Sequence, residues 1–185
     1  MAKSSKEKLP LQATKTLKDL IRFLESLQIP FCLIGGASLG HYKLGRFTKD
    51  LDFKLSISES SWPKLKAALE SSVHISHLKI SFIADPNLPD LVRMNWGDYP
   101  VDLLMANTDY QQEVIRNAHK GTVEDIEVPV ASPEDLIILK LIADRPQDRV
   151  DVGLLFENVP NLDLAYIRQW CKVWEVEERL NQLIP

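Results

Sequence analysis

The sequence predicts an α/β fold of the α+β type, with a short mixed sheet, flanking helices and a helical C-terminal part. Two observations lead to this prediction. Short apolar or alternating runs typical of strands occur between residues 31 and 130, and segments with helical spacing separate them. After residue 131 only helical patterns follow. We therefore expect a loose polar tail at 1–10, an α/β core at 11–131, and a helical extension at 132–185 that packs on the core.

In the first part of the chain, apolar periodicity and glycine or proline stops define the elements. Leucines and isoleucine between Leu17 and Leu27 follow three-and-four spacing, and Pro30 ends this helix. The apolar run at 31–34 is a short strand that ends in Gly35 and Gly36. The next expected elements are a helix at 37–43 that Gly45 stops, an alternating strand at 51–55, and a helix at 58–71.

Turn residues separate the elements of the second part. Runs at 74–84, 91–96 and 100–105 are strand-like; prolines make 85–90 a loop, and Gly97 with Asp98 marks a tight hairpin. A helix at 109–117 and a strand at 122–130 complete the α/β part. Ser132, Pro133 and Asp135 occupy the first positions of a well-specified helix at 133–143, and helices at 147–157 and 162–184 follow.

Composition bounds the function only loosely. The chain has 185 residues, a hydrophobic share of 45% and a net charge of -4, as expected of a small globular enzyme without a dominant nucleic-acid surface. No apolar stretch approaches the roughly 20 residues that cross a bilayer, and the N-terminus is too polar for a signal peptide. We expect a cytoplasmic protein with no membrane partner. Cys32 and Cys171 show no metal or disulfide spacing and are interpreted as packing residues.

The Gly-Gly pair after the first strand is suited to phosphate binding. Gly35 and Gly36 let the backbone pass close to a bound group without a side chain in between. The helix expected after them would offer free backbone amides and the positive end of its dipole, with Ser38 as a further donor at its N-terminus.

Asp50 and Asp52 indicate a metal site on the next strand. Alternation with leucine and phenylalanine places both carboxylates on one strand face, roughly 6.6 to 6.8 Å apart at Cα. This separation suits one shared divalent cation, or two cations about 3.5 to 4 Å apart. Aspartate is depleted inside strands, and two on one face repel unless a positive charge lies between them.

These residues together resemble the nucleotidyltransferase superfamily, whose signature is a Gly-Gly or Gly-Ser turn followed on the next strand by Asp-x-Asp. Within it, the chain is most similar to the AbiE-type toxin family of minimal nucleotidyltransferases, with which it shares an Arg-x-Thr-x-Asp-hydrophobic-Asp string. Asp102 matches the third carboxylate of the superfamily. The matching residues of that string and of the later helices are Arg46, Thr48, Asp50, Leu51, Asp52, Glu134, Asp135, Leu136, Lys140, Arg145, Asp148 and Asp151. Gln147 departs from the pattern, since lysine is usual there.

The resemblance implies transfer of a nucleoside monophosphate from an NTP to a hydroxyl acceptor, with release of pyrophosphate. The acceptor would be an RNA end, a protein side chain or a small molecule, and an antitoxin or toxin partner protein is implied. Mg²⁺ would be the cofactor, in a two-metal site. The implied catalytic and metal-binding residues are Asp50, Asp52 and Asp102, and the implied nucleotide-binding residues are Gly35, Gly36, Ser38, Arg46, Thr48 and Lys140.

Structural alternatives remain for most of these residues. Asp50 and Asp52 are also compatible with turn capping and pairing to Lys49 and Lys54. Lys140 points along an apolar helix face, where a phosphate or an acidic residue would meet its ammonium group; otherwise the stem packs while the ammonium reaches water.

The alternative function is a catalytically inactive nucleotidyltransferase-like module with a binding or regulatory role, such as an antitoxin-like partner. Phosphatases of the haloacid dehalogenase type and sugar-nucleotide glycosyltransferases also use Asp-x-Asp. The sequence context disfavours both: Phe53 and Lys54 follow the motif where the phosphatases have small residues, and the glycosyltransferase fold needs a longer chain.

Overall fold

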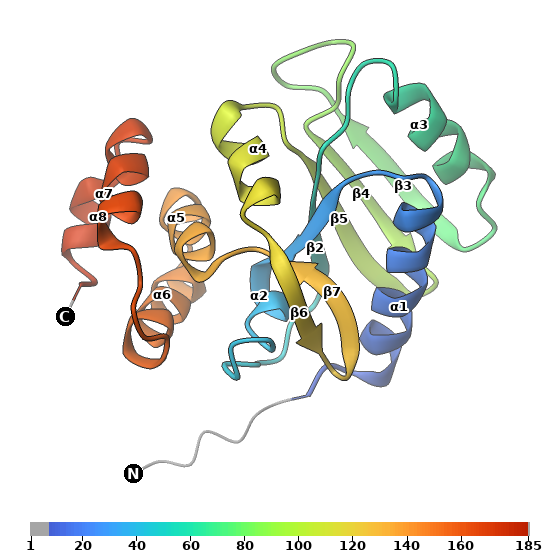
Figure 1. Ribbon diagram of the computed structural model, residues 1–185. Helices are drawn as coiled ribbons and strands as arrows, with labels where there is room; N and C mark the ends of the chain where they lie inside the picture. The colour runs from blue at the N-terminus through green and yellow to red at the C-terminus, as the bar shows by residue number, and fades with distance from the viewer. Residues whose placement is uncertain (1–7, 185) are drawn as a thin grey trace. The chain divides into compact units, whose positions relative to one another are not determined.

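A computed structural model describes residues 8–184 and has the predicted α/β architecture (Figure 1). The expected tail at 1–10 falls mostly on residues 1–7, which lie outside the described part. Within 8–184 the helices are α1 (Leu11–Ser26), α2 (Gly35–Ser38), α3 (Trp62–Ser71), α4 (Asp109–Arg116), α5 (Pro133–Ala143), α6 (Pro146–Asn158), α7 (Leu164–Val173) and α8 (Glu177–Asn181). The strands are β1 (Phe31–Ile34), β2 (Leu51–Leu55), β3 (Ile75–Ser81), β4 (Leu91–Trp96), β5 (Tyr99–Met105), β6 (His119–Val123) and β7 (Ile126–Val130).

The chain divides into two compact units, Met1–Val130 and Ala131–Pro185. The first unit holds one mixed sheet in the order β3-β4-β5-β2-β1-β7-β6. Strand β2 is parallel to β5 and antiparallel to β1, and β4 is antiparallel to β5. This order brings β1, β2 and β5 side by side at the centre of the sheet, which is where most of the predicted site residues lie.

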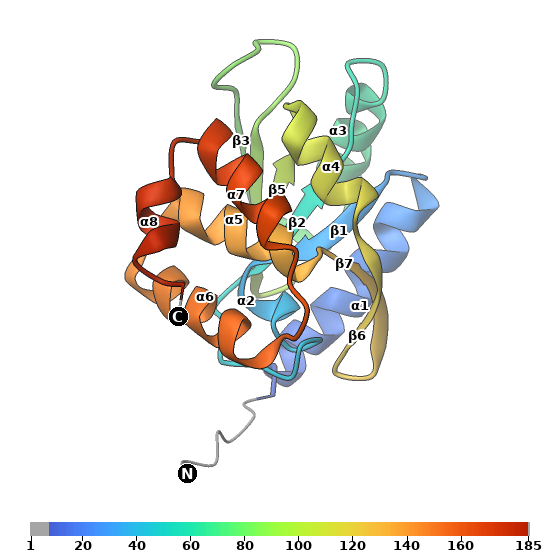
Figure 2. The same cartoon turned by 60° about the vertical axis from the view of Figure 1, so that its left-hand side comes forward.

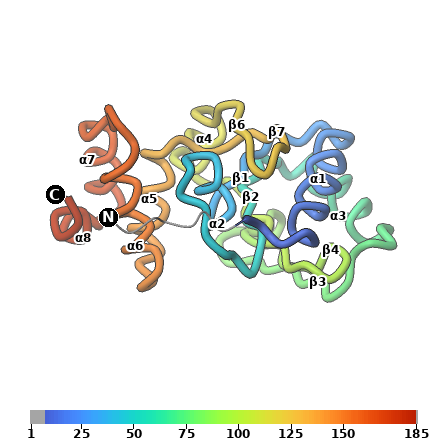
Figure 3. The backbone as a smooth tube through the Cα atoms, turned by 90° about the horizontal axis from the view of Figure 1, so that it is seen from below, coloured from blue at the N-terminus to red at the C-terminus, as the bar shows by residue number. Residues whose placement is uncertain are grey.

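One face of the sheet carries the core of the first unit. In β2, the residues Leu51, Phe53 and Leu55 are fully buried, as the alternating pattern predicts. Helices α1 and α3 cover this face, and α4 lies on the other side (Figures 1 and 3). Each fully buried leucine of α1 contributes roughly 1.5 to 3 kcal/mol to folding, so burial rather than capping holds that helix, which has no side-chain cap.

The Gly97–Asp98 hairpin is confirmed. Trp96 of β4 pairs with Tyr99 of β5 across a two-residue turn, and Gly97 has a φ of 61°. Such turns need positive φ, which glycine adopts at little cost. The short turn fixes the register of the two strands. The longer loop between β3 and β4 extends beyond the sheet (Figure 2).

Three predicted elements were wrong in their extent. The strand expected at 122–130 is a hairpin of β6 and β7, because Glu124 and Asp125 adopt φ values of 48° and 62° and reverse the chain. The helix expected at 162–184 is two helices, since Glu175, with a φ of 56°, breaks it after α7. The helix expected at 37–43 is the single turn α2 followed by tight turns that end at Lys43, whose φ is 62°.

Smaller differences concern element ends. Helix α1 begins at Leu11, before the periodic stretch that predicted it, and α3 begins at Trp62 because Ser58 and Ser61 form a hydrogen-bonded turn instead. The strand expected at 74–84 is shorter, since Asp90 accepts hydrogen bonds from the amides of Ile83 and Ala84 and holds them in a loop. None of the helices formed by residues 8–184 has the length and apolar character that a bilayer crossing requires.

Candidate active site

The end of β1 meets the start of β2 at Gly35 and Asp52. Asp52 pairs with Ile34 across the two antiparallel strands, so its side chain lies beside the next residue, Gly35. A Cβ added at Gly35 would lie 2.0 Å from Asp52 Oδ2, and Gly35 has a φ of 67°. Only glycine satisfies both the backbone conformation and this contact. The carboxylate and the glycine backbone are therefore closely apposed, as the motif predicts.

Gly36 lies against the segment that precedes β2. A Cβ added there would come within 3.0 Å of Thr48 Oγ1 and 3.3 Å of Arg46 Nη1. Thr48 is buried, and its hydroxyl lies 3.1 Å from both Asp50 O and Asp50 Oδ1. The structure therefore brings the glycine pair together with Arg46, Thr48 and Asp50. Asp50 precedes β2 in a bend rather than lying inside the strand, which corrects the prediction that both carboxylates share one strand face.

The sequence patterns did not indicate Tyr99, which contacts the segment that carries Asp50. Its hydroxyl donates to the carbonyl of Thr48 over 2.7 Å and so fixes the segment that carries Asp50. Burial, followed by the negative charge of Asp50, raises the pKa of the Tyr99 phenol. Tyr99 thus remains a neutral hydrogen-bond donor at neutral pH.

Asp102 lies on β5 directly beside Asp52. The parallel pairing of β2 and β5 sets the two residues opposite each other, and residues paired in this way project from one face. Arg93 of β4 pairs with Asp102 on the other side. Its Nε and Nη2 atoms donate to the two oxygens of Asp102 over 2.8 and 2.6 Å. Arg93 was also missed, although the two-residue Gly97–Asp98 turn sets its register opposite Asp102.

Ser38 does not occupy the position that the sequence suggested. It is the last residue of α2, not the start of a helix, and its hydroxyl donates to the Gly35 carbonyl over 2.7 Å. The helix is only one turn long because tight turns follow at once. In this structure, Ser38 stabilises the glycine turn.

Lys140 belongs to the second unit, on α5. Its ammonium group is buried and forms ion pairs with Asp148, at 3.4 Å, and with Asp151 on α6, at 2.5 Å. Arg145 also bonds Asp148, and Gln147 donates to Asp151 over 3.1 Å. An anionic partner of Lys140 was one of the two predicted arrangements. Gln147 stands where the family pattern has a lysine, and its hydrogen bond is to Asp151, the aspartate that also pairs with Lys140.

The family comparison decides the class of this arrangement. Residues 19–176 match the family described as the nucleotidyl transferase AbiEii toxin of type IV toxin-antitoxin systems. The chain belongs to the AbiEii family. It is therefore a nucleotidyltransferase. No curated protein matches the chain.

Solved structures agree with the fold of this AbiEii protein. The antibiotic-resistance factor ANT(2'')-Ia has a TM-score of 0.61 at 14% identity, over 93% of this chain and 97% of that one. The lincosamide adenylyltransferase LnuA in its lincomycin-bound form has a TM-score of 0.57 at 14% identity, over 80% and 98%. The nucleotidyltransferase toxin MenT4 from Mycobacterium tuberculosis H37Rv has a TM-score of 0.57 at 15% identity, over 91% and 67%.

The carboxylates of the AbiEii protein are chemically suited to Mg²⁺, which prefers oxygen ligands. Asp52 Oδ2 occupies the space that a Cβ on Gly35 would take, so the carboxylate lies directly against the glycine backbone. Within residues 8–184 no three His, Cys, Asp or Glu side chains converge on one point as a preformed metal site. Both oxygens of Asp102 are engaged by Arg93.

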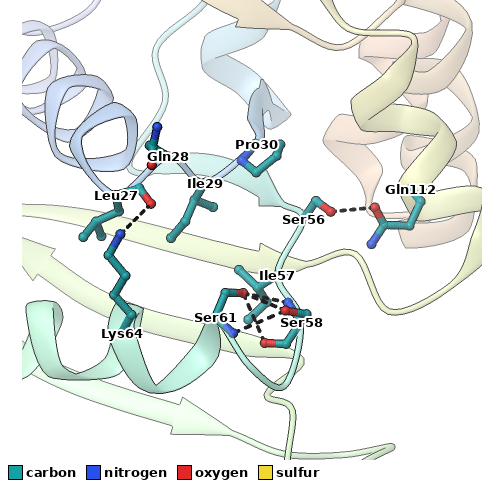
Figure 4. Close-up of a pocket in the computed structure, with 10 residues that line it drawn as sticks. All are labelled: Leu27, Gln28, Ile29, Pro30, Ser56, Ile57, Ser58, Ser61, Lys64 and Gln112. Atoms are coloured by element: carbon teal, nitrogen blue, oxygen red, sulfur yellow. Dashed lines mark hydrogen bonds between the residues drawn. The ribbon is translucent and has the colours of Figure 1, made fainter.

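A separate pocket of about 420 Å³ lies at the other end of β1 and β2 (Figure 4). Pro30, Ser56, Lys64 and Gln112 are among its lining residues. Pro30 precedes β1, whereas Gly35 follows it, so roughly four residues of strand, about 13 Å, separate this pocket from the glycine pair. The pocket is therefore not the nucleotide site predicted from the motif.

Proposed function

We propose that this enzyme transfers a nucleoside monophosphate from an NTP to a hydroxyl acceptor, releases pyrophosphate, and depends on a divalent cation. The observation that carries the proposal is the row formed by Gly35, which directly follows β1, Asp52 on β2 and Asp102 on β5. It combines a backbone turn that has no side chain at Gly35 with two carboxylates on neighbouring strands. Phosphoryl-type transfer needs mainly positioning and charge neutralisation, which such a row supplies.

Asp50, Asp52 and Asp102 would hold Mg²⁺, in two sites according to the superfamily resemblance. Bound Mg²⁺ supplies charge neutralisation for the phosphate oxygens and for the oxygens that attack and leave. Thr48 and Tyr99 keep the segment of Asp50 in place. The backbone position of Asp50 is therefore fixed before any ligand binds.

The remaining residues act on the nucleotide and the acceptor. The backbone amides of Gly35 and Gly36 face the triphosphate, and Ser38 maintains their turn. Arg46 would offset phosphate charge. Asp102 accepts the proton of the attacking hydroxyl, because a carboxylate is an adequate general base once it is released from other partners.

The type IV toxin-antitoxin description of the family supports an antitoxin partner and a macromolecular acceptor, RNA or protein. Among the similar structures, LnuA is a lincosamide adenylyltransferase and ANT(2'')-Ia forms a complex with adenylyl-2''-tobramycin. A small-molecule acceptor is therefore the second candidate class. The fold is common to both classes and does not distinguish them.

A thermal-shift titration tests the proposal. Wild type, Asp50→Asn and Asp98→Asn are each titrated with the four NTPs, with and without Mg²⁺. At a hundred times its Kd, a ligand stabilises the folded protein by about 2.7 kcal/mol. We expect a Mg²⁺-dependent shift with one NTP for wild type and for Asp98→Asn, whose exposed carboxylate lies in the β4–β5 turn. Asp50→Asn should lose that shift.

Transferase assays with labelled NTP complete the test. We expect Asp50→Asn to abolish label transfer to an acceptor while its melting temperature without ligand stays near that of wild type. Full activity in Asp50→Asn would overturn the assignment of this residue. The absence of any nucleotide shift in wild type would support the non-catalytic binding module instead.

A further inference from the structure

Arg93 lies in the same row as the candidate catalytic carboxylates. Pairing across β4, β5 and β2 sets Arg93 opposite Asp102, and Asp102 opposite Asp52. The neighbours of these residues along each strand belong to the core on the opposite face of the sheet. Those neighbours are Val92, Met94, Val101, Leu103, Leu51 and Phe53. The three polar side chains therefore share the face of the sheet that is turned away from this core.

The contact between Arg93 and Asp102 uses both oxygens of the carboxylate. Nε donates to Oδ1 over 2.8 Å, and Nη2 donates to Oδ2 over 2.6 Å. This is the bidentate geometry in which arginine binds carboxylates most strongly. A cation that binds both oxygens of Asp102 must displace these bonds, because the guanidinium group occupies the edge of the carboxylate to which the lone pairs of both oxygens point.

The exposure of the Arg93 side chain and the charges around it allow its guanidinium group to leave Asp102. The side chain of Arg93 is 62% exposed, whereas that of Asp102 is only 12% exposed. Arg93 can therefore move into solvent, but Asp102 cannot. Lys79 of β3 pairs with Arg93 on its far side and carries the same charge, so it offers no competing partner. The charges of Asp50 and Asp52 also act on Arg93 and, after Asp102 itself, raise the pKa of its guanidinium.

We propose that Arg93 competes with the divalent cation for Asp102 and so makes cation binding depend on the nucleotide. In the free enzyme, Arg93 neutralises Asp102 and holds it in position. A cation that arrives with the triphosphate has additional phosphate ligands and displaces the guanidinium, whereas a cation alone competes poorly. Arg93 is thus a positioning residue that acts through Asp102. The inference rests on the proposed function, because it assumes that Asp102 binds the catalytic cation.

Mn²⁺ binding without nucleotide tests the competition, with the free-ion signal in electron paramagnetic resonance as the readout. The variants are Arg93→Gln, Arg93→Lys and, as the matched control, Arg116→Gln. Arg116 is equally exposed, at 60%, and pairs with Glu113 on α4. We expect Arg93→Gln to bind Mn²⁺ about fivefold more tightly than wild type, since it removes an ion pair and a positive charge. Arg116→Gln should bind as wild type does.

Two further variants separate competition from a structural effect. Arg93→Lys keeps the charge but loses the bidentate geometry, so its Mn²⁺ affinity should lie between those of wild type and Arg93→Gln. Arg93→Gln combined with Asp102→Asn should lose the gain, because the freed ligand is gone. Unchanged or weaker Mn²⁺ binding in Arg93→Gln, with its melting temperature near that of wild type, would overturn the proposal.

The same samples with NTP distinguish failure of this inference from failure of the proposed function. If wild type shows a Mn²⁺-dependent NTP shift but Arg93→Gln binds Mn²⁺ alone no better than wild type, only the competition is wrong. If no NTP shift occurs but Arg93→Gln gains Mn²⁺ affinity through Asp102, the competition holds and the proposed transfer reaction fails. If neither effect occurs, both are overturned.

Discussion

At the scale of single residues, Gly35 carries two constraints that can be separated by experiment. Its φ of 67° disfavours any side chain, and an added Cβ would lie 2.0 Å from Asp52 Oδ2. Gly97 has a similar φ of 61° but nothing within 4 Å of an added Cβ. We expect Gly97→Ala to cost about 1 to 2 kcal/mol through backbone strain alone. Gly35→Ala should cost clearly more and should also abolish nucleotide binding, because Asp52 must move.

Chemical denaturation and NTP thermal shifts of the two variants measure this difference. Gly97→Ala should retain the wild-type NTP shift, because its turn lies at the end of β4 and β5 and not beside Asp52. Equal destabilisation of the two variants would show that the contact with Asp52 is easily relieved. In that case the glycine would be required only for its backbone conformation.

Lys54 gives a second prediction, on pH dependence. It is 3% exposed, and burial lowers its pKa from 10.5 to about 8. Between these values the unfolded chain binds more protons than the folded protein, so this residue makes stability rise as the pH rises from about 8 to 10.5. Below pH 8 the buried charge carries its full cost, about 3 kcal/mol from the difference in pKa.

Lys54→Met should therefore stabilise the protein at pH 7 by up to about 3 kcal/mol. The gain should shrink steadily above pH 8 and vanish near the pKa of an unfolded lysine, 10.5. Urea denaturation of wild type and variant at pH 7, 9 and 10.5 measures it. Lys64→Met is a suitable control because Lys64 is exposed, and it should show no such trend. A gain independent of pH would mean that better apolar packing, not the charge, is responsible.

Sequence reasoning identified most of the residues that the structure groups together in the first unit. The Gly-Gly pair, Arg46, Thr48, Asp50 and Asp52 all lie there, since each is close in sequence to a strand end. Their catalytic and nucleotide-binding roles remain predictions. Pairing of the aspartates with nearby lysines does not account for them, because within residues 8–184 neither Lys49 nor Lys54 forms an ion pair.

At the scale of elements, the ion pairs between α5 and α6 should stabilise the second unit. Lys140 is buried together with Asp148 and Asp151. Removing one partner of such a group leaves uncompensated buried charge, which costs about 3 to 5 kcal/mol. We expect Lys140→Met to lower the unfolding free energy by this amount. Arg149→Gln breaks the exposed pair with Asp144 and should cost far less, because solvent screens an exposed ion pair.

Denaturant unfolding of Lys140→Met and Arg149→Gln at pH 7 measures how much unfolding free energy each variant loses. If Lys140→Met were no more destabilising than Arg149→Gln, the buried pairs would not be needed for folding. The predicted phosphate contact would then be the better explanation for a cation at this position. An intermediate loss together with a lost NTP shift would show that Lys140 serves both purposes.

The elements that sequence reasoning missed share one physical cause. Residues with positive φ that are not glycine reverse or break the chain at Lys43, Glu124, Asp125 and Glu175. Lysine and glutamate are not typical turn residues, so of these four positions only Asp125 carries a residue type that marks turns. At Gly97 and Pro133, the predicted element ends agree with the structure to within one residue.

At the scale of the whole molecule, alternation and helical spacing were enough to predict the strands and helices of the α/β part and the helical C-terminal part. They did not predict the strand order, in which β5 inserts beside β2 and β7 pairs with β1. That order follows from long-range pairing, to which local patterns are insensitive. The pairing of Arg93 with Asp102 was accessible in principle, because a two-residue hairpin fixes which residues lie opposite each other.

The net charge of -4 leads to a prediction for the acceptor. Non-specific binding to nucleic acid comes from phosphate neutralisation, and its affinity falls with salt in proportion to the number of phosphates contacted. A net negative chain should neutralise few phosphates. We therefore expect binding to a random RNA weaker than about 10⁻⁴ M near physiological salt, with a shallow salt dependence between about 50 and 200 mM. Fluorescence anisotropy of a labelled RNA measures both quantities.

The result bears directly on how an RNA acceptor would be recognised. With weak and salt-insensitive binding, an RNA could be a substrate only through specific contacts to its reacting end, near Asp102. A slope equivalent to six or more phosphates would contradict the prediction, because it requires many cations on one surface. Lys43, Arg46 and Lys49 lie in the segment between Gly36 and Asp50, so they would be the first residues to neutralise in testing such a surface.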